Sequence, residues 1–151
     1  RSTARRSVPK VVEYVVHNDR LLVFTHDDVA IGVAGVQVPA GTIESGEYPA
    51  DAVVREVWEE AGIVTRVVAD LGVDRYDLWP SKAEVHEQHF FLLEPHDRDV
   101  PERWAAGESD PSGGGPRQSW TCWWMPLRQA HILTAGFGSR IGSLSQHLPR
   151  P

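Results

Sequence analysis

The chain has 151 residues, of which 41% are hydrophobic and 24% charged, with a formal net charge of −6. This size suits one domain with one substantial core, and the composition excludes a chain that is disordered throughout. The acidic charge argues against a nucleic-acid binder with a broad basic surface, and no apolar run approaches the roughly 20 residues of a membrane span. Because Cys122 is the only cysteine, no internal disulfide can form, and we expect a cytoplasmic protein.

The first forty residues predict strands. Two short runs rich in valine and leucine, 11–16 and 21–24, flank an Asn-Asp pair at 18–19 and indicate a β-hairpin. Residues 29–38 form a third strand-like run, which the Pro-Ala-Gly sequence at 39–41 ends.

Residues 49–61 predict the clearest helix. Pro49 suits a first helical turn, and Gly62 suits a C-terminal cap. Between them apolar residues recur at helical spacing, namely Ala50, Val53, Val54, Val57 and Ala61.

The second half predicts shorter elements. Strands are expected at 63–68 and 89–93, with a turn or loop over 74–82, and a last strand at 119–125. The glycine- and proline-rich segment 96–118 predicts a long loop, which Trp104 interrupts. A C-terminal helix is expected from Leu127, broken near Gly136-Phe137-Gly138 and continued by a second piece to His147. This order predicts one α+β domain with a mixed sheet over residues 1–151.

One segment carries a complete motif. Gly41 is followed after five residues by Glu47, and seven more residues precede Arg55-Glu56-Val57. Trp58 then leads into Glu59-Glu60-Ala61-Gly62-Ile63. The segment 41–63 resembles the Nudix box, G-x5-E-x7-R-E-U-x-E-E-x-G-U with U a bulky aliphatic residue, at every fixed position. The resemblance implies a Nudix-like α/β/α sandwich and a hydrolase that cleaves diphosphate linkages.

The helical spacing alone places three carboxylates together. Glu56, Glu59 and Glu60 fall within an arc of about 100°, beside the apolar face. Two like charges about 4 Å apart repel by roughly 4 kcal/mol at an effective dielectric of about 20, so protonation or a bound cation is required. Oxygen ligands suit Mg²⁺, with Mn²⁺ as an alternative. The alternative interpretation is a solvated, glutamate-rich helix face.

The family resemblance assigns further roles. It implies that Arg55 orients Glu56 and pairs with Glu47, that Glu47 is a supporting residue or a metal ligand, and that the carbonyl of Ala40 binds metal. Gly41 is expected to make a sharp turn and to leave room for the metal. Glu56 is one candidate for the general base. Downstream candidates for the base or for an extra ligand are Glu84, His86, Glu87, His89 and Glu108.

The motif indicates the type of reaction more narrowly than it indicates the substrate. Nucleobases need aromatic or apolar walls, for which Tyr76, Trp79, Phe90 and the tryptophans near the last strand are candidates, with Glu87 as a polar contact. We expect a nucleoside di- or triphosphate as the small-molecule partner, no nucleic acid and no membrane, and a monomer or homodimer. The alternatives are ADP-ribose, to which Trp79-Pro80 points by resemblance, nucleotide sugars and dinucleoside polyphosphates. A non-catalytic module that senses nucleotides is the competing class.

Overall fold

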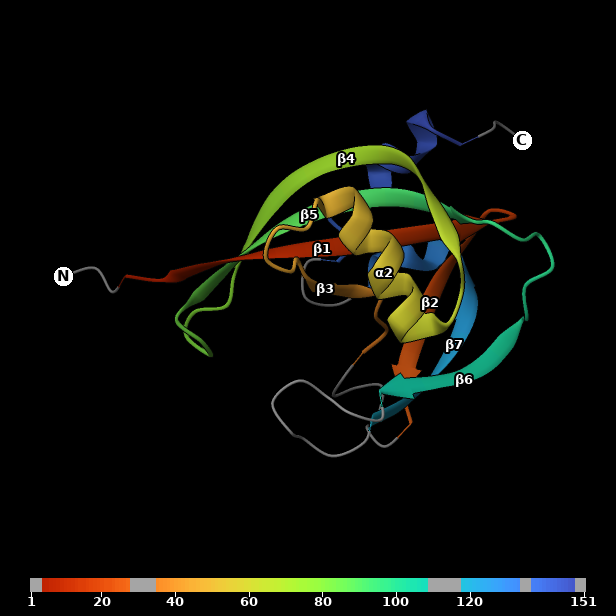
Figure 1. The fold of residues 1–151 in the computed structure, drawn as a ribbon, viewed down its shortest axis with the longest axis horizontal. Helices are drawn as coiled ribbons and strands as arrows, with labels where there is room; N and C mark the ends of the chain where they lie inside the picture. The colour runs from red at the N-terminus through yellow and green to blue at the C-terminus, as the bar shows by residue number, and fades with distance from the viewer. Residues whose placement is uncertain (1–3, 28–34, 109–117, 134–136, 149–151) are drawn as a thin grey trace.

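The computed structural model describes residues 4–27, 35–108, 118–133 and 137–148 (Figure 1). In chain order the elements are β1 (Arg6–His17), β2 (Arg20–His26), β3 (Ala40–Thr42), α2 (Pro49–Ala61), β4 (Thr65–Asp77), β5 (Glu84–Pro95), β6 (Arg103–Glu108), β7 (Gln118–Pro126) and two 3₁₀ helices, η1 (Leu127–Ile132) and η2 (Ile141–Gln146). No helix of the described residues is long and apolar enough to cross a membrane.

The strands of the described residues form one seven-stranded mixed sheet in the order β4-β5-β1-β2-β7-β6, with β3 paired to β1. The β1–β5 pair is parallel and runs in continuous register from Arg6–Glu84 to Val15–Leu93, whereas the other strand pairs are antiparallel. Strand β1 therefore borders three other strands, and β3 is held beside it by pairing of Val12 with Ala40.

Two apolar clusters lie on opposite faces of this sheet. Helix α2 covers one face with Ala52, Val53, Val57 and Ala61. The other cluster includes Ala130 and Leu144 of the two 3₁₀ helices. Figure 1 shows α2 in front of the sheet and the C-terminal segments behind it. The expected α+β sandwich with a mixed sheet is confirmed, with 3₁₀ helices in place of a C-terminal α-helix.

Local chemistry explains the elements that were predicted well. Asn18 and Asp19 both have positive φ (52° and 59°), as a tight hairpin turn between twisted strands requires. Helix α2 begins at Pro49 and ends where Gly62 adopts a left-handed conformation (φ 70°) and donates its N–H to the carbonyl of Trp58. Ala50, expected on the buried stripe, is exposed, and Ala52 is buried instead.

Pairing across the sheet changes other expectations. Strand β4 continues to Asp77 through two register shifts, because β5 supplies a partner along its length, and the turn shortens to 78–83. Strand β6 lies inside the segment 96–118 that composition predicts to be loop, and residues 109–117 of that segment lie outside the described residues. Residues 28–34 of the strand expected at 29–38 are likewise not described, and the remainder forms only isolated bridges at Val36 and Gln37.

Candidate active site

Arg55 connects the loop before α2 to the carboxylates on the helix. Its Nε and Nη2 each donate a hydrogen bond of 2.8 Å to the two oxygens of Glu47. Its Nη1 donates to Glu56 (3.0 Å) and Glu59 (3.1 Å), and Nη2 also reaches the carbonyl of Thr42 (3.2 Å). These bonds to Arg55 hold the pKa of Glu47 at about 2. Because both oxygens of Glu47 are engaged, this geometry favours a supporting role for Glu47 over metal ligation.

Glu56 and Glu60 lie one helical turn apart on α2. The side chain of Glu56 is only 12% exposed, and burial raises its pKa despite the interactions with Glu60 and Arg55 that lower it. Glu59 is turned outward, with its side chain 52% exposed. Glu56 and Glu59 therefore occupy different environments on one arc of the helix.

Gly41 is required because the carboxylate of Glu56 approaches its backbone. A Cβ atom at this position would lie 2.1–2.3 Å from the carboxyl atoms of Glu56. The glycine sits inside β3, opposite Val11 of β1, and its φ is not in the left-handed region. The expected turn is thus wrong as the reason for the glycine, and close approach is the reason in its place.

A fourth carboxylate, Glu13 of β1, lies near this arc. Its side chain is fully buried, and neither oxygen has a hydrogen-bond partner on another described residue. Burial raises its pKa well above the usual range for glutamate, and the charges of Glu60 and Glu56 raise it further. Its backbone N–H donates to the carbonyl of Pro39, directly before β3. Glu13 thus belongs to the same region as the carboxylates of the motif.

The donor set fits a hard divalent cation. Carboxylate and carbonyl oxygens are the ligands that Mg²⁺ and Mn²⁺ prefer, and Gly41 keeps the space beside Glu56 clear of side-chain atoms. Within the described residues, no three His, Cys, Asp or Glu side chains already converge on one point as ligands. Glu56 and Glu59 instead face Arg55.

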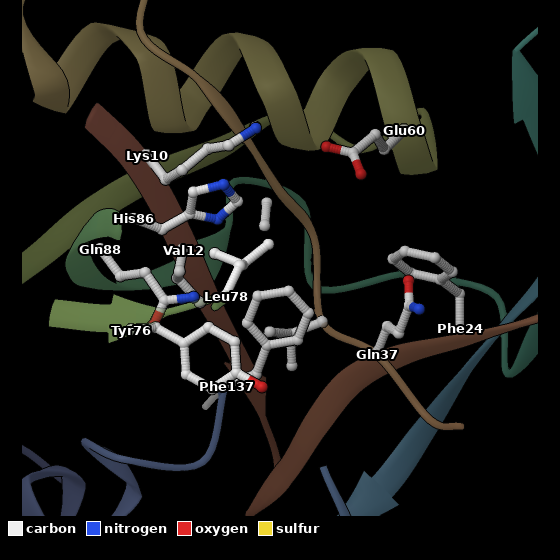
Figure 2. A pocket seen from close by; sticks show the side chains of 13 residues that line it. Lys10, Val12, Phe24, Gln37, Glu60, Tyr76, Leu78, His86, Gln88 and Phe137 are labelled. Carbon is white, nitrogen blue, oxygen red and sulfur yellow. The ribbon is translucent and has the colours of Figure 1, made fainter. Parts of the chain in front are cut away.

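A cavity of about 260 Å³ adjoins Glu60 of α2. Its walls come from β1, β2, β3, β4, β5, α2 and neighbouring loops (Figure 2). The lining residues are Lys10, Val12, Phe24, Gln37, Val38, Ala40, Gly41, Glu60, Tyr76, Leu78, His86, Gln88 and Phe137. Glu60 marks the acidic side, whereas Lys10 and His86 bring nitrogen atoms to another side (Figure 2). The cavity therefore combines aromatic walls, the ammonium group of Lys10, the imidazole of His86 and the carboxylate of Glu60.

The C-terminal segment supplies one wall of this cavity. Arg140 forms two hydrogen bonds to the carboxylate of Asp74 on β4, of 2.7 and 2.8 Å. The hydroxyl of Tyr14 donates to the carbonyl of Phe137, and the backbone N–H of Arg140 donates to the same hydroxyl. These contacts fix Phe137 opposite Tyr76, although 61 residues separate them in the chain.

Several candidates from the sequence lie away from the cavity. Trp79 is exposed and packs against the guanidinium of Arg5, and Glu87 pairs with Arg75 at 3.0 Å. The remaining candidates have other partners or positions: Glu84 bonds Arg6 and His86, His89 bonds Asp70, and Phe90, Trp120 and Trp124 are buried in the core. The side chain of Glu108 lies outside the described residues.

The structure adds residues that the sequence analysis did not select, chiefly Glu13, Lys10, Phe24 and Phe137. A signal existed for Glu13, because it is the one charged residue in the run Val11-Val12-Glu13-Tyr14-Val15-Val16. For Phe24 and Phe137 an apolar core role was equally consistent with the sequence.

Comparison with known proteins agrees with this geometry. The family model described as NUDIX domain matches residues 9–144. An RNA pyrophosphohydrolase from Psychrobacter sp. (strain PRwf-1) is 32% identical over 136 residues, which cover 79% of this chain and 75% of that protein. A UDP-X diphosphatase has a similar structure (TM-score 0.65, 16% identity, 96% of this chain and 64% of that chain). So does a MutT NUDIX hydrolase from Burkholderia pseudomallei (TM-score 0.58, 19% identity, 97% of this chain and 90% of that chain).

Proposed function

The chain belongs to the NUDIX domain family and is a Nudix-type pyrophosphohydrolase, and from this premise we propose that it cleaves the diphosphate linkage of nucleoside di- or triphosphates with a divalent metal. The observation that carries the proposal is the cavity beside Glu60. Its volume of about 260 Å³ lies just under the range of about 300–1,000 Å³ that is usual for small-molecule sites. This size favours one nucleoside over the two of a dinucleoside polyphosphate.

The lining residues match the parts of such a substrate. Phe24, Tyr76 and Phe137 offer ring surfaces for a base. Lys10 and His86 offer cationic or donor nitrogens to phosphate oxygens, on another side of the cavity from Glu60. The substrate would then lie with its base between the rings and its diphosphate toward α2.

Glu56, Glu59, Glu60 and the carbonyl of Ala40 would hold the metal in this proposal. A divalent cation there supplies positive charge that neutralises the diphosphate and activates water. Arg55 keeps Glu56 oriented through the bond at Nη1. As a water oxygen attacks phosphorus and the bridging P–O bond breaks, a carboxylate oxygen of Glu56 takes the proton of that water.

Glutamine substitutions test the metal site. Glu59→Gln and Glu60→Gln should each abolish metal-dependent hydrolysis while the circular-dichroism spectrum stays unchanged, because each removes a charge and keeps the shape. Glu94→Gln is the matched control, since Glu94 lies on β5 and pairs with Arg66. Turnover like the wild type in both helix variants would refute the site.

A 5′-triphosphate end of RNA is the second candidate substrate, because the relatives matched over most of this chain are named RNA pyrophosphohydrolases. It presents the same terminal phosphates and one nucleoside to the cavity. The net charge of −6 disfavours long contacts with the rest of an RNA chain.

A substrate panel separates these proposals. Nucleoside di- and triphosphates, ADP-ribose, a nucleotide sugar, a dinucleoside polyphosphate and a 5′-triphosphorylated oligoribonucleotide are compared by kcat/KM with Mg²⁺. We expect the free nucleotides to give the highest value. A clear preference for the oligoribonucleotide would replace the leading proposal with the second, and binding without turnover would support a sensor.

A further inference from the structure

Glu13 occupies a position where its carboxyl group serves no structural purpose within the described chain. It lies on the face of β1 toward α2, between the buried residues Val11 and Val15. It is fully buried, and neither of its oxygens accepts a hydrogen bond from another described residue. A valine or leucine would fill such a position without leaving polar atoms unsatisfied, and buried polar groups are nearly always paired.

The surroundings of Glu13 are negative. The carboxylate of Glu56 lies against the backbone of Gly41, and Gly41 pairs with Val11, two residues before Glu13 on the same face of β1. The guanidinium of Arg55 is engaged elsewhere, because each of its nitrogens donates to Glu47, Glu56 or Glu59. No positive side chain in the described residues is placed to neutralise Glu13 directly.

Glu13 therefore approaches the carboxylates of α2 from the sheet side. Strand β1 also carries β3, and the N–H of Glu13 is bonded to the carbonyl of Pro39, the residue before Ala40. The carboxyl group of Glu13 and the carbonyl of Ala40 are thus supplied by two adjacent strands facing one helix arc.

We infer that Glu13 is an additional carboxylate ligand of the divalent metal, completing from β1 the site that Glu56 and Glu60 begin on α2. This inference rests on the proposed metal site, and adds to it a residue outside the motif. A cation at this position neutralises the buried carboxylates together and gives the oxygens of Glu13 the partner that they lack.

The test measures metal binding by the protein alone, without substrate. Mn²⁺ is titrated calorimetrically into wild type, Glu13→Gln, Glu60→Gln and the surface control Glu94→Gln, and melting temperatures are recorded with EDTA and with Mn²⁺. Glu13→Gln should raise the Kd for Mn²⁺ by about 10-fold or more, as loss of a metal-site contact does. In EDTA its melting temperature should be no lower than that of wild type, and Mn²⁺ should raise that temperature by less than it does for wild type. Glu94→Gln should match wild type in both measurements.

The outcomes distinguish this inference from the proposed function. If wild type binds no Mn²⁺, or Glu60→Gln binds it as tightly as wild type, the proposed metal site itself fails. If Glu60→Gln loses affinity while Glu13→Gln retains that of wild type, only the role of Glu13 is overturned.

A second measurement covers a Glu13→Gln variant that does not fold. In ¹³C-labelled wild-type protein, Mg²⁺ should shift the Cδ resonance of Glu13 and saturate at the same concentration as the shift of Glu60. A Glu13 resonance that stays unmoved while that of Glu60 shifts would overturn the inference.

Discussion

Gly41→Ala should inactivate the enzyme without unfolding it. The new Cβ would lie 2.1 Å from Cδ of Glu56, whereas carbon atoms in contact are about 3.5 Å apart, so the carboxylate must retreat by about 1.4 Å. A displacement of this size at a catalytic group costs about 100-fold in rate, or about 2.7 kcal/mol. The hydrogen bond from Arg55 to Glu56 is strained or lost as well, which should reduce stability by about 1–2 kcal/mol.

The assay is kcat/KM on the best substrate of the panel at saturating Mg²⁺, together with urea unfolding. Gly142→Ala is the control, since a Cβ there meets nothing within 4 Å and the φ angle is not in the left-handed region. We expect it to match wild type in both measurements. If Gly41→Ala keeps the wild-type kcat/KM, the position of the Glu56 carboxylate does not control the reaction, and the reasoning from close approach is refuted.

Three further predictions concern stability and reactivity. Trp104→Phe removes the 2.8 Å hydrogen bond from the indole to the carbonyl of Ala61 and should lower the free energy of unfolding in urea by about 1–3 kcal/mol; an unchanged value would mean that water replaces the bond. The pKa of Glu47, about 2 in the folded protein and about 4.3 when unfolded, contributes stability above pH 4.3 that is lost as the pH falls toward 2. Wild type should therefore lose more stability than Glu47→Gln between pH 6 and 2.5, and parallel curves would contradict the ion pair with Arg55. Cys122 is fully buried, and burial raises its pKa to about 12, so native protein should resist a thiol reagent at pH 8 until urea unfolds it; rapid labelling of the native protein would show that the thiol is accessible.

The elements that the sequence predicts well are those with local causes. The hairpin turn at 18–19 and helix α2 depend on residues a few positions apart, and both are confirmed. The Nudix box is likewise local, so its spacing alone indicates that Glu56, Glu59 and Glu60 share an arc. The family resemblance predicts that Arg55 pairs with Glu47 and orients Glu56, and in the structure Arg55 donates hydrogen bonds to both.

The features that could not be predicted from the sequence depend on contacts between distant segments of the chain. Three residues of strand β6, Ala105, Ala106 and Gly107, have little β propensity, and the strand forms because β7 supplies a partner. Phe137 reaches the cavity only because Arg140 is bonded to Asp74 on β4. Glu13 lies near the carboxylates of α2 only because β1 passes beneath that helix. None of these pairings has a periodic signature in the chain.

The long parallel register between β1 and β5 has a consequence for how the enzyme is made. Arg6 and Glu84, which pair at one end of it, are 78 residues apart. At about 5–20 residues per second, the ribosome needs roughly 4–16 s to synthesise the intervening chain. During that interval α2 with its glutamates is already present, while β1 lacks the neighbour that holds it in the centre of the sheet. Strand pairings between such distant segments form slowly. Helix α2 is therefore synthesised well before the sheet that positions its glutamates is complete.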